Sequence, residues 1–232
     1  MDLEGCINEY ITGREEKPGR TPEGRYSSFD YCYNYFYSFY KENRIEKLAS
    51  DENIQMSCLQ IGFYLASSGL MGRSSSLIER SVRNFQGVIS TISQVDPVLW
   101  EIDLDSYTPE NIELLLECRN SIINSFNDDV KVSEAIVTRI MLEVFGNIPV
   151  FDQYFKNSMK MNKVSQRSLI KLREFYEENK SSFDSFDIHT LDFLSGKEID
   201  VPYTKARLLD IYGYMNGQFK KHDICRDWSM DF

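Results

Sequence analysis

Hydrophobic residues recur at three- and four-residue spacing along most of this chain, which is the period of an amphipathic helix. Serine, threonine or proline precedes several of these stretches, where helices usually begin, and glycine or proline follows others. One stretch is apolar around much of its circumference, which predicts a central helix. The predicted helices cover residues 3–11, 27–40, 52–70 (the central one), 74–94, 109–126, 133–145, 151–159, 165–180, 183–194 and 204–219.

The aromatic segment 27–40 admits two interpretations. Its apolar residues form a helical stripe, but Tyr31, Tyr33, Tyr35 and Tyr37 also alternate with the period of a strand. The aromatic residues that stand side by side at its end fit a strand poorly. We expect a helix whose aromatic side chains are mostly in the core, with an exposed stacking surface as the alternative.

The fold class follows from this pattern. No low-complexity linker divides the chain and no period of 20 to 50 residues repeats, so a solenoid is not expected. We predict an all-α fold, a compact orthogonal multi-helix bundle of about nine to eleven helices in a single unit over residues 1–232. The Gly/Pro-rich stretch near 13–25 is predicted to be an exposed, flexible loop.

Composition narrows the class further. Hydrophobic residues make up 42% of the 232 residues, as in globular proteins, and no apolar run is long enough to cross a bilayer. The acidic start, Met-Asp-Leu-Glu, does not resemble a signal peptide. Five scattered cysteines and two distant histidines suggest neither disulfides nor a metal site. A cytoplasmic protein without metal or cofactor is therefore expected.

The charge balance bears on possible partners. A net charge of −10 repels phosphate backbones at long range, which disfavours nucleic acid as a ligand without excluding it. Two local groups of bases could still hold an anion. One lies in the stretch 13–25 and includes Arg25, and the other contains Arg73, Arg80 and Arg83.

A glycine-bracketed turn at residues 69–76 is the first candidate site. It places Arg73, Ser74 and Ser75 at the start of a predicted helix, where free backbone N–H groups, hydroxyls and a guanidinium suit an anion such as phosphate. The motif lacks the Gly-Lys-Ser/Thr ending of a phosphate-binding loop. Ordinary serine capping of a helix is the competing interpretation.

The second candidate site is the segment 133–155, in which an apolar helix runs into a Gly-Asn-Ile-Pro turn followed by Asp152. The turn places Asp152 at or near a helix N-terminus, where we expect its pKa to fall. Tyr154 follows two residues later. The competing interpretation is that Asp152 only caps its own helix.

The order of an apolar helix, a Gly/Pro-containing turn and the residues Val-Phe-Asp152-Gln-Tyr-Phe resembles the catalytic segment of helix-hairpin-helix DNA glycosylases. The resemblance covers about 25 residues. It implies that Asp152 stabilises positive charge that develops on a sugar as a damaged base departs. The glycine hairpin of that family is replaced here by the acidic stretch 127–131, and no lysine stands in a matching lyase motif.

A wider resemblance is to uncharacterised bacterial and phage-borne helical proteins. It rests on three blocks, RYSSFDYCY at 25–33, GFYLASSG at 62–69 and GNIPVFDQYF at 146–155. The resemblance implies no known activity. It does suggest that Tyr26, Arg73 and Asp152 converge, and it suggests a setting in defence, counter-defence or mobile elements.

Three functions remain open from the sequence. The leading hypothesis is a helical binding protein that holds a small anionic ligand or a protein partner near Arg73 and the turn 146–155. The first alternative is an enzyme that resembles the glycosylases and uses Asp152. The second is an oligomerisation or partner-binding module, which requires an exposed aromatic patch of Tyr31, Tyr35 and Tyr37.

Overall fold

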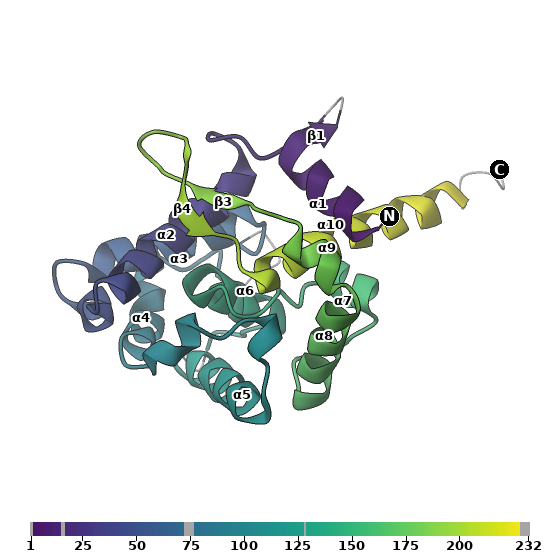
Figure 1. The fold of residues 1–232 in the computed structure, drawn as a ribbon. Helices are drawn as coiled ribbons and strands as arrows, with labels where there is room; N and C mark the ends of the chain where they lie inside the picture. Colours follow the sequence, from purple (N-terminus) through teal and green to yellow (C-terminus); the bar gives the residue numbers. More distant parts are fainter. Residues whose placement is uncertain (1, 15–16, 72–76, 128, 228–232) are drawn as a thin grey trace.

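The computed structural model describes residues 2–14, 17–71, 77–127 and 129–227, with side chains up to residue 218. Ten α-helices lie in these described residues, together with two hairpins of very short strands (Figure 1). The predicted all-helical, multi-helix fold of about nine to eleven helices is therefore confirmed. None of the helices in the described part has the length and hydrophobicity needed to span a bilayer.

α-Helices make up most of the elements in the described residues. The α-helices are α1 (Leu3–Thr12), α2 (Ser28–Lys41), α3 (Ile54–Ser67), α4 (Gln86–Ile92), α5 (Pro109–Asn124), α6 (Glu134–Phe145), α7 (Gln153–Met159), α8 (Gln166–Glu178), α9 (Lys180–Asp184) and α10 (Lys205–Asp227). The strands pair as β1 (Gly13–Arg14) with β2 (Lys17–Pro18) and β3 (His189–Leu191) with β4 (Glu198–Pro202), both antiparallel. Short 3₁₀ turns connect several of them, including η1 (Arg25–Ser27), η3 (Val82–Phe85) and η5 (Leu104–Ser106).

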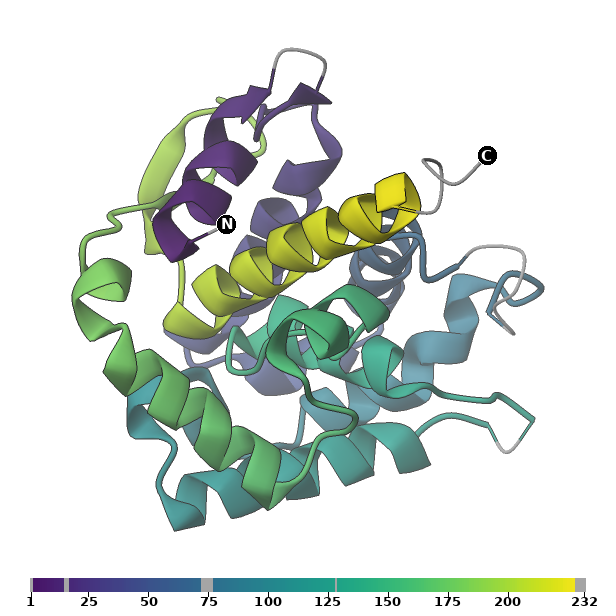
Figure 2. The same cartoon turned by 90° about the vertical axis from the view of Figure 1, so that its right-hand side faces the viewer.

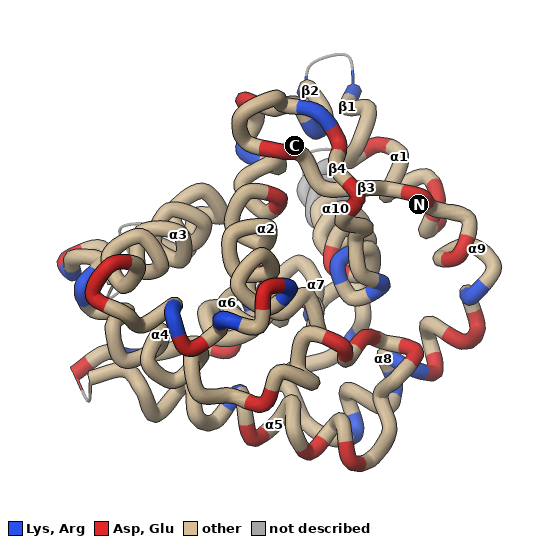
Figure 3. Tube along the Cα trace, turned by 60° about the vertical axis from the view of Figure 1, so that its left-hand side comes forward, with Lys and Arg blue, Asp and Glu red and all other residues tan. Residues whose placement is uncertain are grey.

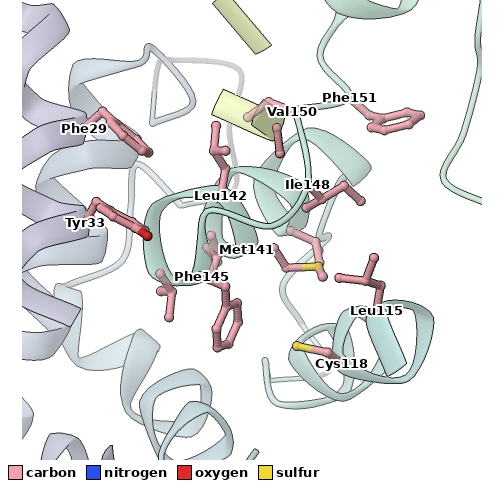
Figure 4. Close-up of a cluster of buried hydrophobic side chains, with 14 of the residues drawn as sticks. Phe29, Tyr33, Leu115, Cys118, Met141, Leu142, Phe145, Ile148, Val150 and Phe151 are labelled. Atoms are coloured by element: carbon pink, nitrogen blue, oxygen red, sulfur yellow. The ribbon is translucent and has the colours of Figure 1, made fainter. Parts of the chain in front are cut away.

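Helix α6 is the centre of the core. Every residue from Ile136 to Phe145 is buried. The sequence predicted the central helix at 52–70, which is α3, but α6 is more completely buried. Its apolar side chains lie between those of α2 on one side and α5 on the other (Figure 4). Helix α3 instead leaves Met56 and Phe63 exposed.

Several predicted helix ends are confirmed at the level of single atoms. The Ser133 hydroxyl accepts a hydrogen bond from the Ile136 N–H and so begins α6. Gly146, with φ of 71°, ends α6 in the left-handed conformation that favours glycine. Thr108 caps α5 directly before Pro109, as expected from their order in the sequence.

Two of the helix predictions, for 74–94 and 183–194, were wrong. In residues 77–94, the described part of the predicted helix 74–94, the chain forms only the turn η3 and the short helix α4. The turn η3 packs on α3, where Val82 lies against Gly62, and Ile78 is exposed although it belongs to the predicted apolar stripe. The segment 183–194 forms the end of α9 and the strand β3. Asp30 of α2 accepts the Leu191 N–H, so β3 is held to the bundle by a contact from 161 residues away in sequence.

Most described residues of the stretch 13–25 are exposed, as predicted, but two of its short segments pair with each other. It contains the β1–β2 hairpin, and the Arg20 side chain is buried against the second hairpin. The Arg20 guanidinium donates to the His189 carbonyl at 2.6 Å and to the Tyr203 hydroxyl at 3.1 Å. Arg20, which follows the first hairpin, therefore connects this early part of the chain to the β3–β4 hairpin and to Tyr203.

Helix α10 crosses the molecule between α1 and α7 (Figure 2). Gly213 and Gly217, one turn apart on α10, let α7 approach closely. A Cβ atom at Gly213 would lie 2.2 Å from the Phe155 ring, and one at Gly217 would lie 2.2 Å from the Tyr154 carbonyl oxygen. Asp103 in turn caps α10, because its carboxylate accepts the N–H groups of residues 205 and 206 at 2.7 and 2.8 Å.

Candidate functional site

A cavity of about 280 Å³ lies where α1, η1, α3, α6, α7 and α10 meet. This volume is close to the lower limit of small-molecule sites, about 300 Å³. Its charged lining consists of three arginines and two aspartates: Arg25, Arg139, Arg207, Asp152 and Asp210. Five tyrosines complete much of the wall, so that the cavity combines charge with aromatic surface.

Arg207 and Asp210 of α10 bind each other and the rest of the fold, although Arg207 Nε, like Arg139 Nε, has no hydrogen-bond partner among the described residues. Arg207 Nη1 lies 2.7 Å from Asp210 Oδ2, and its Nη2 donates to the Tyr10 hydroxyl at 2.5 Å. Its guanidinium also stacks 4.1 Å from the Phe29 ring centroid. The other Asp210 oxygen accepts the Val150 N–H at 3.0 Å, so this pair holds α10 to the turn before α7.

Arg139 of α6 is buried but loosely held. Its two terminal nitrogens lie 3.4 Å from the Tyr64 hydroxyl and 3.4 Å from Asp152 Oδ2. Charge-assisted hydrogen bonds between nitrogen and oxygen are normally about 2.7–2.9 Å long. Among the described residues Arg139 Nε has no partner. Arg139 and Asp152 therefore form a stretched pair at the cavity wall, with donor and acceptor capacity left over.

Asp152 both caps its own helix and faces the cavity, two roles that the sequence presented as alternatives. One carboxylate oxygen accepts the Phe155 N–H at 2.9 Å and caps α7, while the other faces Arg139 at the cavity. Contrary to the predicted fall, its pKa is raised. Burial raises this pKa more than the Arg139 charge lowers it, and the charge of Asp210 raises it further.

Arg25 stands at the rim of the cavity and is exposed. Its guanidinium donates to the Tyr214 hydroxyl at 2.5 Å and lies 5.2 Å from the centroid of the Tyr26 ring. Among the described residues no carboxylate lies within ion-pair distance of it. Arg25 is thus the one cavity arginine whose charge is not balanced by an aspartate in the described chain.

The structure brings together three of the residues predicted from sequence: Tyr26, Asp152 and Tyr154 all line this cavity. Arg73, Ser74 and Ser75 lie outside the described residues. The predicted convergence of Tyr26 with Asp152 is present, while the part of that prediction that concerns Arg73 stays a prediction.

The predicted exposed aromatic patch on α2 does not form. Tyr31, Tyr35 and Tyr37 are all partly buried, because each ring packs against other rings. The hydroxyls of Tyr31 and Tyr35 are also hydrogen-bonded, to Pro22 and Ser57. The core interpretation of this segment is therefore the better description.

Sequence reasoning missed Arg139, Arg207 and Asp210 as cavity residues. A signal for the first was present, because Arg139 and Glu143 are the two charged residues in the otherwise apolar or neutral run 135–145. A charged side chain on a helix that is buried on all sides is energetically costly unless it is paired, so it marks a structural or functional contact. For Arg207 and Asp210 no such signal existed, since polar and apolar residues are mixed in the first turns of their helix, as in an ordinary amphipathic helix.

The described residues contain no cluster of three or more histidine, cysteine, aspartate or glutamate side chains that could hold a metal ion. Comparisons of the chain with protein-family models, with curated proteins and with solved structures find no match. The site is consequently interpreted from its own chemistry.

Proposed function

We propose that this protein binds a small anionic ligand in the cavity, with Arg25 supplying the positive charge that attracts it. The observation that carries the proposal is the balance between the arginines and the aspartates that line the cavity. Arg207 is paired with Asp210 and Arg139 is close to Asp152, whereas Arg25 has no carboxylate partner among the described residues. An anion at the rim would complete the charge balance of the site.

The rest of the molecule makes this local excess of positive charge more significant. The chain has a net charge of −10, and acidic residues are spread over most elements of the fold (Figure 3). An anion that approaches this protein is repelled at long range, so a specific site must supply its own cation. The proposal is for a cytosolic protein, which the four buried, unpaired cysteines of the described chain support.

Binding of pyrophosphate measured by isothermal titration calorimetry tests this proposal. A charge-assisted hydrogen bond contributes about 1.5–3 kcal/mol, so we expect Arg25→Ala to weaken binding by about tenfold or more. Arg25 is exposed, so its loss should leave the fold intact. Arg44→Ala is the matched control, because Arg44 is also exposed and does not line the cavity. Equal affinities of the two variants, or no saturable binding by the wild type, would contradict the proposal.

The second candidate function is the glycosylase-like reaction that uses Asp152. The observation that favours it is the position of Asp152, at the N-terminus of α7 with one oxygen at a cavity that three arginines line. In this case the wild type should release a free base from oligonucleotides that contain damaged bases, and Asp152→Asn should abolish that release. Base release that is unchanged in Asp152→Asn would exclude this role for Asp152.

A further inference from the structure

We infer that the ligand is a nucleoside monophosphate whose base carries an amino group. The inference rests on the proposed function and specifies its ligand. In this arrangement the phosphate lies at Arg25 on the rim, the base packs against tyrosine rings, and the edge of the base meets the Arg139–Asp152 pair. Three properties of the lining lead to this class of molecule.

The first property is aromatic surface from three separate elements. Tyr26 comes from η1, Tyr154 from α7 and Tyr214 from α10, and all three are half-buried at the cavity. Tyr154 and Tyr214 meet edge to face, with centroids 5.4 Å apart at 80°. Aromatic rings on a cavity wall favour a planar, polarisable ligand group, and base stacking on such a ring contributes about 1–3 kcal/mol.

The second property is a set of acceptors that a bare anion cannot use. Ser67 and Ser68 line the cavity, and their hydroxyls donate to α3 carbonyl oxygens at 2.9 Å, so toward the cavity they offer lone pairs. Asp152 Oδ2, at 3.4 Å from Arg139, is a further acceptor. A ligand that uses these acceptors donates hydrogen bonds as well as carrying negative charge; hydrogen phosphate offers only the P–OH groups of its charged end, and simple dicarboxylates offer no donor at neutral pH. Ribose hydroxyls and a base amine meet this requirement.

The third property is a donor beside an acceptor in the same wall. Arg139 donates and Asp152 accepts, and the 3.4 Å separation of the Arg139 terminal nitrogen from Asp152 Oδ2 leaves both atoms able to bond a ligand. Adenine and cytosine present the complementary edge, an amino donor next to a ring-nitrogen acceptor. Asp152 and Tyr154 line the same cavity, and in the proposed arrangement a base that packs on the Tyr154 ring presents its edge to the carboxylate. The cavity volume of about 280 Å³ fits one nucleotide rather than a polymer.

Calorimetric titration with adenosine monophosphate, ribose 5-phosphate and inorganic phosphate tests whether the base is recognised. We expect the nucleotide to bind about 5- to 150-fold more tightly than ribose 5-phosphate, the range that corresponds to base stacking. Tyr154→Leu should remove most of this difference, and Tyr154→Phe should keep it because the ring remains. Equal affinity of the wild type for the nucleotide and for ribose 5-phosphate would overturn the inference.

Asp152→Asn tests recognition of the amine. Asparagine caps helices as well as aspartate does, so α7 should be preserved, but the group that faces the cavity changes from an acceptor to an N–H donor. The wild type should prefer adenosine monophosphate to purine riboside 5′-monophosphate, which lacks the amine, by about tenfold. The variant should lose this preference while its circular dichroism spectrum stays that of the folded wild type; its melting temperature should fall, because Arg139 loses its neighbouring carboxylate. A preference that survives the substitution would contradict this role for Asp152.

The outcomes separate the two levels of the proposal. If pyrophosphate binds in an Arg25-dependent manner but the nucleotide gains nothing from its base, the nucleotide inference fails and the anion site stands. If no phosphate-bearing probe binds, both fail together.

Discussion

At the scale of single residues, Glu143 is the least explained side chain of the core. It is completely buried on α6, and neither carboxylate oxygen has a hydrogen-bond partner among the described residues. Burial raises its pKa well above the ordinary value, and the nearby Arg139 charge opposes this only in part. The folded state therefore favours the neutral acid.

We therefore expect Glu143 to lower the free energy of unfolding as the pH rises. Because the folded-state pKa of Glu143 is raised, its contribution to stability is fully present below the unfolded pKa of about 4.5 and is lost as the pH rises above it. Glu143→Gln is neutral at every pH. Its free energy of unfolding, relative to that of the wild type, should increase from pH 4 to pH 8.

Urea denaturation at several pH values measures this difference. Glu113→Gln is the control, because Glu113 is an exposed glutamate on α5 and should show little such trend. A difference between Glu143→Gln and the wild type that stays constant with pH would mean that Glu143 titrates normally in the folded protein.

At the scale of elements, the contact between α7 and α10 determines where Asp152 and Tyr154 lie. The backbone of α7 rests directly on Gly217, where a Cβ atom would come within 2.2 Å of a carbonyl oxygen. Backbone atoms cannot turn aside as a flexible side chain can. The position of the cavity wall is thus set by the absence of a side chain on the neighbouring helix.

Gly217→Ala should push α7 away from α10 and destabilise the fold. Overpacking costs about 1–3 kcal/mol, and the gain in helix propensity, about 1 kcal/mol, offsets only part of it. Thermal denaturation should show a lower melting temperature, whereas Gln153→Ala, at an exposed position on α7, should change stability by less than about 0.5 kcal/mol. A melting temperature that is unchanged in Gly217→Ala would show that the two helices can separate without cost.

At the scale of the whole molecule, the sequence predicted what depends on neighbouring residues and missed what depends on distant ones. The ends of α5 and α6 follow from Thr108, Ser133 and Gly146, which act within a few residues. Strand β3 could not be predicted, because the group that fixes it, Asp30, lies 161 positions earlier. The same limit applies to the site: Asp152 was identified from its turn, but Arg207 enters the cavity only through the path of α10.

Because residues far apart in sequence meet at the cavity, the order of synthesis determines when the cavity forms. Tyr10 and Arg25 lie near the beginning of the chain and Arg207 and Tyr214 near its end, yet the hydrogen bonds between them form one wall of the cavity. Contacts of such long sequence separation form late, because almost the whole chain must be ordered to close them. A growing polypeptide therefore lacks this wall of the cavity until α10 has emerged from the ribosome.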